Sequence, residues 1–473
     1  MTIRIKSVNT WLSFTLACAF HSAFTQETHA SPSPGLRVGA AAIPLKASDD
    51  MVIGGSIFGG KVKGQEGELR ATAVVLEQEP FGRFAIVACD ILMINRDLLD
   101  PVLMDIEIKL GIPNSRVLIN CTHTHHAPST VKVHGYDRDP IFCKEVQRGI
   151  FAAVKQAVEN LSKDDCEFRF HLGREDTVGR NSRFMMPDGQ IRWSGSWMNA
   201  VRPTGPFDPE LPSLSFHDSK GDLIASLFNH STHTIGFRRG RHRSPAFYGL
   251  AAQELEQEKG GVFCFLEGAS GSTHRLSITA ELATERIKNA VADNLEKALP
   301  REVARIASAK RLFSFRVRFF DEEAEERAVT AYCRKSHGRM AESVIKVFRD
   351  QRKELESKQG ETRQTWLQVM AIGDVAIVGV PGEFFTKLGL DIKNRSPFRH
   401  TYIAELANDW IGYLPDRDAH KLGGYQCWTG LHSYAEPGTG ERIVDEAVDM
   451  LLELAAPGAA STPAEAGASA SRP

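Results

Sequence analysis

The sequence predicts an α/β (α+β) fold in which one large domain holds mixed β-sheets flanked by helices. Short apolar runs the size of buried strands alternate with longer segments whose apolar residues follow helical spacing. No segment in the middle of the chain has the length and flexibility of an interdomain linker. Several apolar runs end in polar residues, which is how sites form at strand ends in α/β proteins.

The first half of the chain begins with strand-like runs rich in Val, Ile and Ala. Strands are expected at 71–79, 83–91 and 115–126. Helices are expected at 95–110 and 140–161. The glycine-rich stretch 53–68 predicts loops that approach another group closely. Asp188-Gly189 predicts a turn before a short strand.

The second half repeats one layout, in which a hairpin leads into polar residues. A hairpin is predicted at 211–234, and its second strand ends in histidines. Helices are expected at 245–259 and 278–298, and a buried strand running into a small-residue loop at 260–275. Residues 301–360 are highly charged, with one alternating strand at 313–320 and helices with solvated faces. The layout recurs at 365–385 and 400–416.

Composition places the chain among soluble globular proteins. It has 473 residues, of which 42% are hydrophobic and 25% charged, so it can bury a substantial core. The formal net charge of −2 gives no global basic excess, which argues against nucleic acid as a main partner. No segment after the N-terminal region has 18 or more apolar residues without charges, so no transmembrane span is predicted.

The two ends of the chain have their own compositions. Arg4 and Lys6 precede an apolar stretch and then small and polar residues, which predicts a signal peptide over residues 1–30 and export to the periplasm or beyond. Lipoprotein anchoring at Cys18 is an alternative. The Ala/Ser/Pro/Gly-rich tail 456–473 is expected to be disordered, which leaves a catalytic domain over residues 35–455.

Four apolar strands end in residues that can bind a metal or transfer protons. These residues are His123, His125 and His126; His230 and His233; Glu383; and Asn408, Asp409 and Tyr413. Residues two apart in a strand face the same side, so His123 and His125 are expected to share a pocket while His126 points elsewhere. Any one histidine-rich turn can be a buried core feature, but the recurrence favours zinc, which takes three or four N/O ligands.

The motifs resemble those of the neutral/alkaline non-lysosomal ceramidase family. "NCTHTHHAP" is similar to its Thr-His-Thr-His-Ser-Gly-Pro motif, and "SLFNHSTHTIG", "GEFF" and "ANDWIGYLP" follow in the family's order. The resemblance covers about residues 36–450. It is to the short bacterial members, because the family's C-terminal immunoglobulin-like domain has no counterpart in this sequence.

The resemblance implies a site residue by residue. It implies that zinc is held by His123, His230, Glu383 and Tyr413, and that Tyr413 also helps to polarise the substrate carbonyl. His125 matches the histidine that contacts the scissile group. The family's substrate-facing arginine matches either Arg180 or Arg183. His126, His233 and Asp409 are expected to support the ligands or contact the substrate.

One loop departs from the family pattern. Ceramidases carry a catalytic serine in an Asn-x-Gly-Asp-x-Ser-Pro loop, and "GASGSTHR" places His274 at the serine position when aligned on Gly271. His274 is therefore expected to donate a proton, to stabilise an oxyanion or to act as a fifth ligand. The arginine-rich run 237–244 is either a surface loop or a site for a carboxylate or sulfate of the substrate.

These observations favour an exported zinc-dependent hydrolase. Its substrate is expected to be an N-acylated lipid or an acylated or anionic sugar, with the amide or ester bond cleaved by metal-activated water. One alternative is a metal-dependent lyase or epimerase that acts on a glycan with His125 and His274 as acid and base. Another is a non-catalytic protein that binds a metal or a glycan. The sequence does not indicate an oligomeric state.

Overall fold

The computed structural model describes residues 35–193, 197–238 and 240–456. The predicted signal peptide, Cys18 and the predicted tail beyond residue 456 lie outside these ranges. The described residues belong to one compact unit with mixed sheets and helices, which confirms the predicted α/β class. Among them, no helix has both the length and the apolar character that crossing a membrane requires.

The same succession of elements occurs three times along the chain. Three antiparallel strands are followed by a helix, a fourth strand that lies parallel to the third, and a second helix. A crossover helix is what a parallel pair requires, because a tight turn cannot join two parallel strands. The repeated hairpin of the sequence pattern is therefore the middle of a larger repeated unit.

The first unit forms a four-stranded sheet with the order β1-β2-β3-β4. Its strands are β1 (Arg37–Pro44), β2 (Arg70–Gln78), β3 (Gly82–Cys89) and β4 (Val117–Cys121). Its helices are α1 (Arg96–Leu110) and α2 (Pro140–Glu159). Asp139 caps α2 by accepting hydrogen bonds from the backbone N–H groups of Ile141 and Phe142, and Pro140 occupies the first helical position.

The second unit forms the sheet β12-β11-β10-β5-β14. Its strands are β5 (Glu167–Arg174), β10 (Glu210–His217), β11 (Leu223–His230), β12 (Val262–Glu267) and the short β14 (Leu299–Pro300). Its helices are α3 (Ala246–Lys259) and α4 (Ala280–Lys297). Short strands inserted between β5 and β10 are β6 (Gly179–Asn181), β7 (Phe184–Met185), β8 (Ile191–Arg192) and β9 (Arg202–Pro203). The first of these pairs with β13 (Thr273–Arg275).

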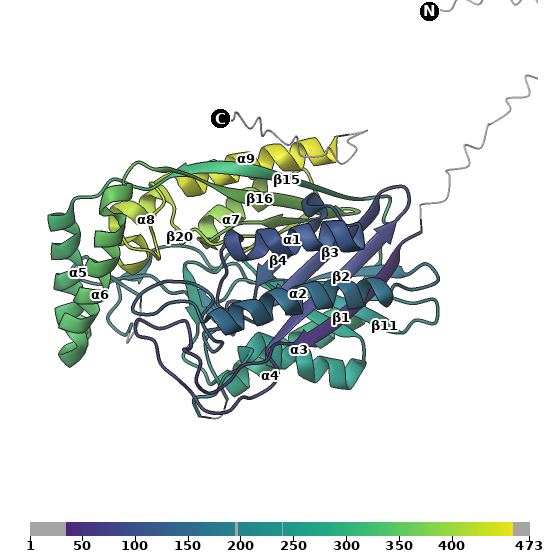
Figure 1. The fold of residues 1–473 in the computed structure, drawn as a ribbon, viewed down its shortest axis with the longest axis horizontal. Coiled ribbons are helices and arrows are strands. Elements are labelled where there is room, and N and C mark those ends of the chain that lie inside the picture. The colour runs from purple at the N-terminus through teal and green to yellow at the C-terminus, as the bar shows by residue number, and fades with distance from the viewer. Residues whose placement is uncertain (1–34, 194–196, 239, 457–473) are drawn as a thin grey trace, which may run out of the picture. The chain divides into compact units, whose positions relative to one another are not determined.

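The third unit forms the sheet β15-β16-β17-β19. Its strands are β15 (Ile306–Arg316), β16 (Thr362–Ile372), β17 (Val375–Gly379) and β19 (His400–Ala404). Its helices are α7 (Thr386–Arg395) and α9 (Thr439–Ala455), and the insertions are α5 (Glu322–Ser336), α6 (Ala341–Leu355) and α8 (Arg417–Leu422). The short strands β18 (Glu383–Phe384) and β20 (Tyr413–Leu414) pair in parallel. Figure 1 shows α5 and α6 as a pair beside the sheets.

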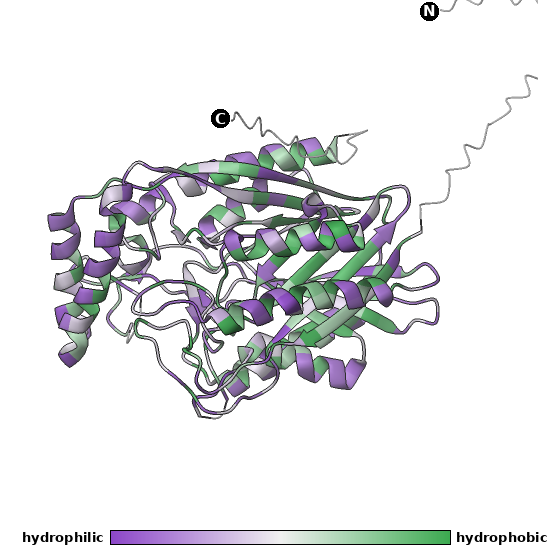
Figure 2. Cartoon of the chain, in the orientation of Figure 1, coloured by the Kyte–Doolittle hydropathy of each residue, from purple (hydrophilic) through white to green (hydrophobic). Residues whose placement is uncertain are grey.

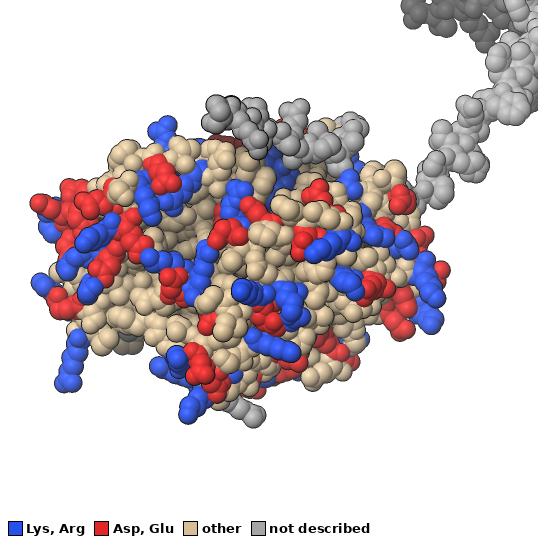
Figure 3. All heavy atoms as spheres, in the orientation of Figure 1, with Lys and Arg blue, Asp and Glu red and all other residues tan. Residues whose placement is uncertain are grey.

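Both faces of the sheets are buried, which explains the nearly continuous apolar runs of their strands. In β3, Ala85 and Val87 pack toward the core that contains α1 and α2, while Phe84 and Ile86 pack into a core shared by the three large sheets. Figure 2 shows apolar strands between helices whose outer sides are polar. On the face shown in Figure 3, basic and acidic side chains are intermixed.

Two predicted boundaries differ from the structure. The strand expected at 313–320 overlaps the end of β15, which starts at Ile306 and ends at Arg316. The strand expected to run through 115–126 ends at Cys121, and His123 has a left-handed backbone with φ 59°. The strand ends early because His123 leaves the extended conformation. The position of the His123 side chain is therefore set by a turn.

Candidate metal centre

The site lies where the carboxyl ends of three parallel strand pairs meet. The pairs β3/β4, β11/β12 and β17/β19 each belong to one of the three repeated units. Backbone hydrogen bonds join the segments after these strands across units: Asn408 N–H donates to the Ile119 carbonyl, Glu405 to Glu267, and Gly271 to Phe384. Each unit therefore contributes residues to one common centre, as strand ends do in other α/β folds.

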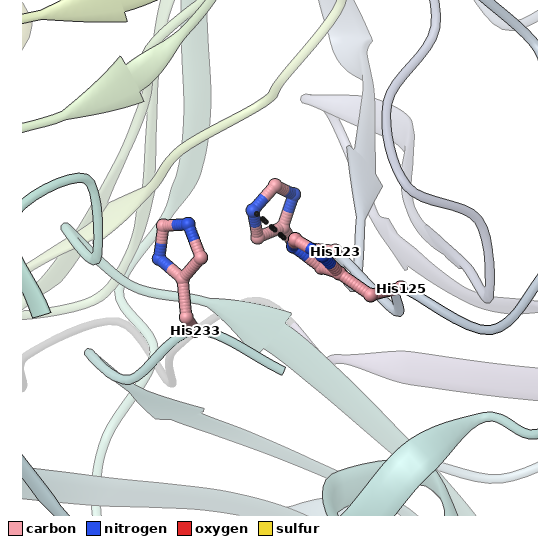
Figure 4. A group of neighbouring side chains, drawn as sticks. All are labelled: His123, His125 and His233. Carbon is pink, nitrogen blue, oxygen red and sulfur yellow. Dashed lines mark hydrogen bonds between the residues drawn. The ribbon is translucent and has the colours of Figure 1, made fainter. Parts of the chain in front are cut away.

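Three histidines approach one another at this centre. The ring nitrogens of His123, His125 and His233 that could ligate an ion all lie within 4.8 Å of one another. Figure 4 shows His123 and His125 coming from one segment and His233 from another, with their rings directed toward a common space. The Nε2 atoms of His123 and His125 are 3.3 Å apart.

Hydrogen bonds at the Nδ1 atoms of these rings determine that the Nε2 atoms face the centre. Nδ1 of His123 lies 3.0 Å from the Leu92 carbonyl, Nδ1 of His125 lies 2.6 Å from that of Gly55, and Nδ1 of His233 lies 2.9 Å from that of Ser270. A carbonyl only accepts, so each Nδ1 carries the proton and each Nε2 presents a lone pair. Lone pairs from three rings face one another, an arrangement that a cation stabilises.

A carboxylate and a phenol complete the group. Glu383 Oε2 lies 3.6 Å from Nε2 of His123 and 3.5 Å from Nε2 of His233, and the Tyr413 hydroxyl lies 3.2 Å from Nε2 of His233. Donor atoms placed tetrahedrally about 2.0–2.1 Å from a zinc ion are separated by about 3.3–3.4 Å. These three donor separations, 3.2, 3.5 and 3.6 Å, are close to that spacing.

Burial keeps the imidazoles neutral. Desolvation, and then the neighbouring His233, hold the pKa of His123 well below its ordinary value. Desolvation, followed by repulsion from His125, lowers the pKa of His233 to about 3. Neutral rings are the form that binds a metal, so no proton has to leave a histidine at neutral pH.

Neighbouring groups hold the carboxylate and His233 in place. The indole N–H of Trp410 donates to Glu383 Oε1 at 3.3 Å. Glu405, which is fully buried, accepts hydrogen bonds from the hydroxyl and the backbone N–H of Ser270, whose carbonyl in turn contacts His233. Such outer contacts set the orientation of metal ligands. Sequence reasoning missed both Trp410 and Glu405, although Trp410 lies inside the quoted "ANDWIGYLP" motif.

The structure does not bring His230 to this group, and His233 takes the place expected for it. His230 is the last residue of β11, and its two ring nitrogens contact the Tyr248 hydroxyl and the Glu175 carbonyl. Successive side chains of a strand alternate between faces, so His230 shares the face of Phe228 and points toward α3. His233 lies three residues farther, in the loop, and can turn toward the centre.

His125 and His126 separate as expected, although by a turn and not by strand alternation. His125 borders both the small cavity at the cluster, of about 30 Å³, and a larger cavity of about 560 Å³. His126 Nε2 accepts a hydrogen bond from the backbone N–H of Gly236 at 2.9 Å, and its ring packs edge-on against Phe237. His126 thus ties the first histidine segment to the loop after β11.

His274 lies beside the cluster and stacks on His233, with ring centroids 4.7 Å apart. Burial holds its pKa well below the ordinary value. The nearby serines are occupied elsewhere: Ser270 donates to Glu405, and the Ser272 hydroxyl pairs with that of Thr386. Neither serine replaces the hydroxyl that the family pattern would place at position 274.

The two candidate arginines have different surroundings. Arg183 is 1% exposed, and its guanidinium donates to Gln426 Oε1 and to the Gly423 carbonyl, so it holds the segment after α8 in place. Arg180 is partly exposed, pairs across the β6–β13 ladder with His274 and lies over the ring of Trp197. Of the two, Arg180 is the one placed beside His274.

Asp409 does not reach the centre. One of its carboxylate oxygens accepts from the backbone N–H groups of Arg96 and Trp410, and the other accepts from the hydroxyl of Thr365. Its contacts join the start of α1 to β16, so its role is to hold the loop that carries Trp410 and Tyr413. This use of a carboxylate at a helix start is a common cap.

The fold and the site define a class of protein with a mixed α/β architecture and a histidine-rich centre at the strand ends. It is the fold of neutral ceramidases: the chain is similar to the neutral ceramidase from Pseudomonas aeruginosa, with a TM-score of 0.70 and 17% identity over 91% of this chain and 76% of that one. It is similar also to a ceramidase complexed with C2, with a TM-score of 0.68 and 16% identity over 89% and 75% of the two chains. No protein-family model and no curated sequence matches the chain. The expected resemblance is thus confirmed for the fold.

Proposed function

We propose that this protein is a zinc-dependent hydrolase of the neutral ceramidase family that cleaves an amide or ester bond. The observation that carries the proposal is the convergence of three Nε2 lone pairs, from His123, His125 and His233, beside the carboxylate of Glu383. A cation stabilises that arrangement, whereas burial disfavours protonation of the rings. The similarity to ceramidase structures supports the same reading.

The donor set suits zinc. His123, His233, Glu383 and Tyr413 supply two nitrogens and two oxygens, and Nε2 of His125 lies 3.3 Å from that of His123. A zinc ion held by these four groups would take water or a carbonyl oxygen as a fifth ligand, and it would polarise that carbonyl or lower the pKa of that water to about 7. The chain therefore has no need of a serine nucleophile, and Ser270 and Ser272 are held in other hydrogen bonds.

His125 is the proton acceptor that the geometry favours. The Gly55 carbonyl holds the proton on Nδ1, so Nε2 is free to accept a proton from the attacking water. His125 also borders the larger cavity, from which a substrate reaches it. When the C–N bond breaks, that proton passes to the leaving nitrogen, and the acyl group keeps the oxygen of water.

We propose that His274, which stacks on His233, and Arg180 contact the substrate. No hydrogen bond engages the ring nitrogens of His274 within the described part of the chain, so they are available to a substrate atom. Arg180 lies opposite it in the ladder and carries a fixed positive charge. Together they can stabilise negative charge that develops on a carbonyl oxygen.

The proposed substrates are N-acylated lipids or acylated and anionic sugars, and the proposed place of action is outside the cytoplasm after removal of residues 1–30. A metal-dependent lyase or epimerase would use the same His125 and His274, and the second imidazole beside the cluster suits that chemistry also. Products formed in ¹⁸O-labelled water separate the two, because only hydrolysis places one labelled oxygen in the released acid.

The test combines metal analysis with turnover. Purified protein is expected to contain about one zinc ion per chain and to hydrolyse N-acyl or O-acyl substrates, and a chelator is expected to abolish the activity until zinc is restored. His233→Ala should lose the metal, whereas His230→Gln should keep it. Full activity of a metal-free preparation would overturn the proposal.

A further inference from the structure

The larger cavity beside His125 has a distinctive lining. It has a volume of about 560 Å³, within the range of small-molecule sites. His125 and Gly55 border both this cavity and the small cavity at the histidine cluster, so the two cavities adjoin at the proposed catalytic centre. A group bound in the larger cavity is therefore adjacent to the bond that the protein would cleave.

The cavity is lined by basic side chains and by no acidic ones. Lys61, Lys63, Arg241 and His242 lie on its walls, and no Asp or Glu is among its described lining residues. No ion pair engages the two lysines or Arg241 within the described part of the chain. The lining of this cavity thus carries a single sign of charge, whereas basic and acidic side chains are intermixed on the face shown in Figure 3.

Two of the neighbouring arginines differ from Arg241. Arg238 forms an ion pair with Glu254, and Arg243 forms one with Asp49, so both are neutralised within the protein. Arg241, between them in the sequence, is exposed and faces the cavity. Among the described arginines of the run, Arg241 therefore supplies this cavity with an unpaired guanidinium, beside Lys61 and Lys63 of the glycine-rich stretch.

The two basic segments are joined to each other. Nδ1 of His242 lies 2.7 Å from the carbonyl of Lys63, and the backbone N–H of Arg243 donates to the carbonyl of Gly64 at 3.1 Å. These hydrogen bonds hold the two segments of the cavity wall together, although the charged side chains that they carry are exposed. Ile53, Ile235 and Phe237 supply an apolar side of the same cavity.

We propose that this cavity is a subsite for an anionic group of the substrate, so that the protein prefers amides carrying a carboxylate or similar anion close to the scissile bond. The inference rests on the proposed hydrolase function and names its substrate class. Guanidinium and ammonium groups bind carboxylate, sulfonate and phosphate through charge-assisted hydrogen bonds. The apolar side accommodates the hydrocarbon next to the charge.

The test uses two amides that share an acyl chain. N-hexanoylglycine carries a carboxylate, and N-hexanoylethanolamine carries a hydroxyl in its place. Wild-type protein is expected to have a kcat/KM about tenfold to hundredfold higher for the first, since hydrogen bonds to charged groups are of that strength. N-hexanoyltaurine and N-hexanoylaminoethylphosphate, compared with the glycine amide, show which anion fits best.

The variant removes the charges of the subsite. K61Q/K63Q/R241Q is expected to bring the two kcat/KM values within about threefold of each other by slowing only the anionic substrate. The control K109Q/K220Q/R327Q removes the same number of charges at exposed positions that do not line the cavity, and it should keep the preference. Equal kcat/KM values for both amides in the wild type would refute the subsite while leaving the hydrolase intact.

A binding measurement distinguishes failure of the subsite proposal from failure of the hydrolase proposal. If neither amide is cleaved, calorimetric titration with N-hexanoylglycine still reports on the cavity. Binding by the wild type that is lost in the triple variant supports the subsite, and equal binding by both refutes it. An effect of the triple variant confined to binding of anionic lipid vesicles also refutes it, because the charges would then serve a membrane surface.

Discussion

Gly271 offers a way to move the proposed metal ligand Glu383 without changing any ligand. A Cβ atom at position 271 would lie 2.3 Å from the backbone oxygen of Glu383 and 2.6 Å from its carbonyl carbon. Gly271 has no positive φ, so alanine suits its backbone and the effect is purely steric. The loop after β12 packs directly on β18 at this position. The backbone N–H of Gly271 also donates a hydrogen bond to the Phe384 carbonyl.

The size of the displacement follows from the contact. Ordinary van der Waals contact begins near 3.4 Å, so Gly271→Ala requires the two backbones to separate by about 1 Å. The Glu383 carboxylate lies 3.5 and 3.6 Å from two imidazole nitrogens, and a shift of that size breaks the tetrahedral spacing. We expect a loss of about 100-fold in kcat/KM, zinc binding weakened about tenfold or more, and about 1–3 kcal/mol of stability lost.

The assay measures zinc affinity by competition with a chromophoric chelator, together with amide hydrolysis and thermal unfolding. Ser277→Ala, at an exposed position in the same segment, is the control and should change none of the three. A Gly271→Ala protein that binds zinc within about twofold of the wild type and keeps its kcat/KM would refute the placement of Glu383 at the metal.

Three further predictions concern other positions. Trp410→Phe removes the hydrogen bond to Glu383 and should weaken zinc binding about tenfold in the same competition assay, and it should also lower the melting temperature because Trp410 is buried in the core. His233→Ala should release the metal, whereas His230→Gln should lower the melting temperature and keep the metal, as elemental analysis and calorimetry would show. Lys310 is buried, and desolvation lowers its pKa from 10.5 to about 7. Between about pH 7 and about pH 10 the unfolded chain keeps this proton whereas the folded protein has lost it. The free energy of unfolding should therefore rise with pH in that window. Lys310→Met should remove this rise in denaturant titrations and stabilise the protein at pH 7 by on the order of 4 kcal/mol, while Lys109→Met, at an exposed position, should leave the rise unchanged.

Local patterns in the sequence carried most of the element assignments. The apolar runs of β2, β3 and β17 are buried almost throughout, and α2 begins at Pro140, where the helix over 140–161 was expected to start. These features depend on neighbours within a few residues, which is why they can be read from the sequence. The start of β15 at Ile306 was not predicted, because Ile306 pairs with Ile372, which lies 66 positions farther along the chain.

The sequence by itself determined the chemistry of the site: imidazoles after β4 and β11, a carboxylate after β17 and a phenol after β19. Only the tertiary structure decided which members of these groups meet. His230 and His233 are three residues apart, and the strand ends between them. His230 therefore points toward α3, whereas His233 points toward the centre. Arg183 and Asp409 likewise match the expected residue types, yet each is bound to distant segments. The physical reason is that a motif specifies donors, whereas their directions depend on where each strand ends and on contacts between the three repeated units.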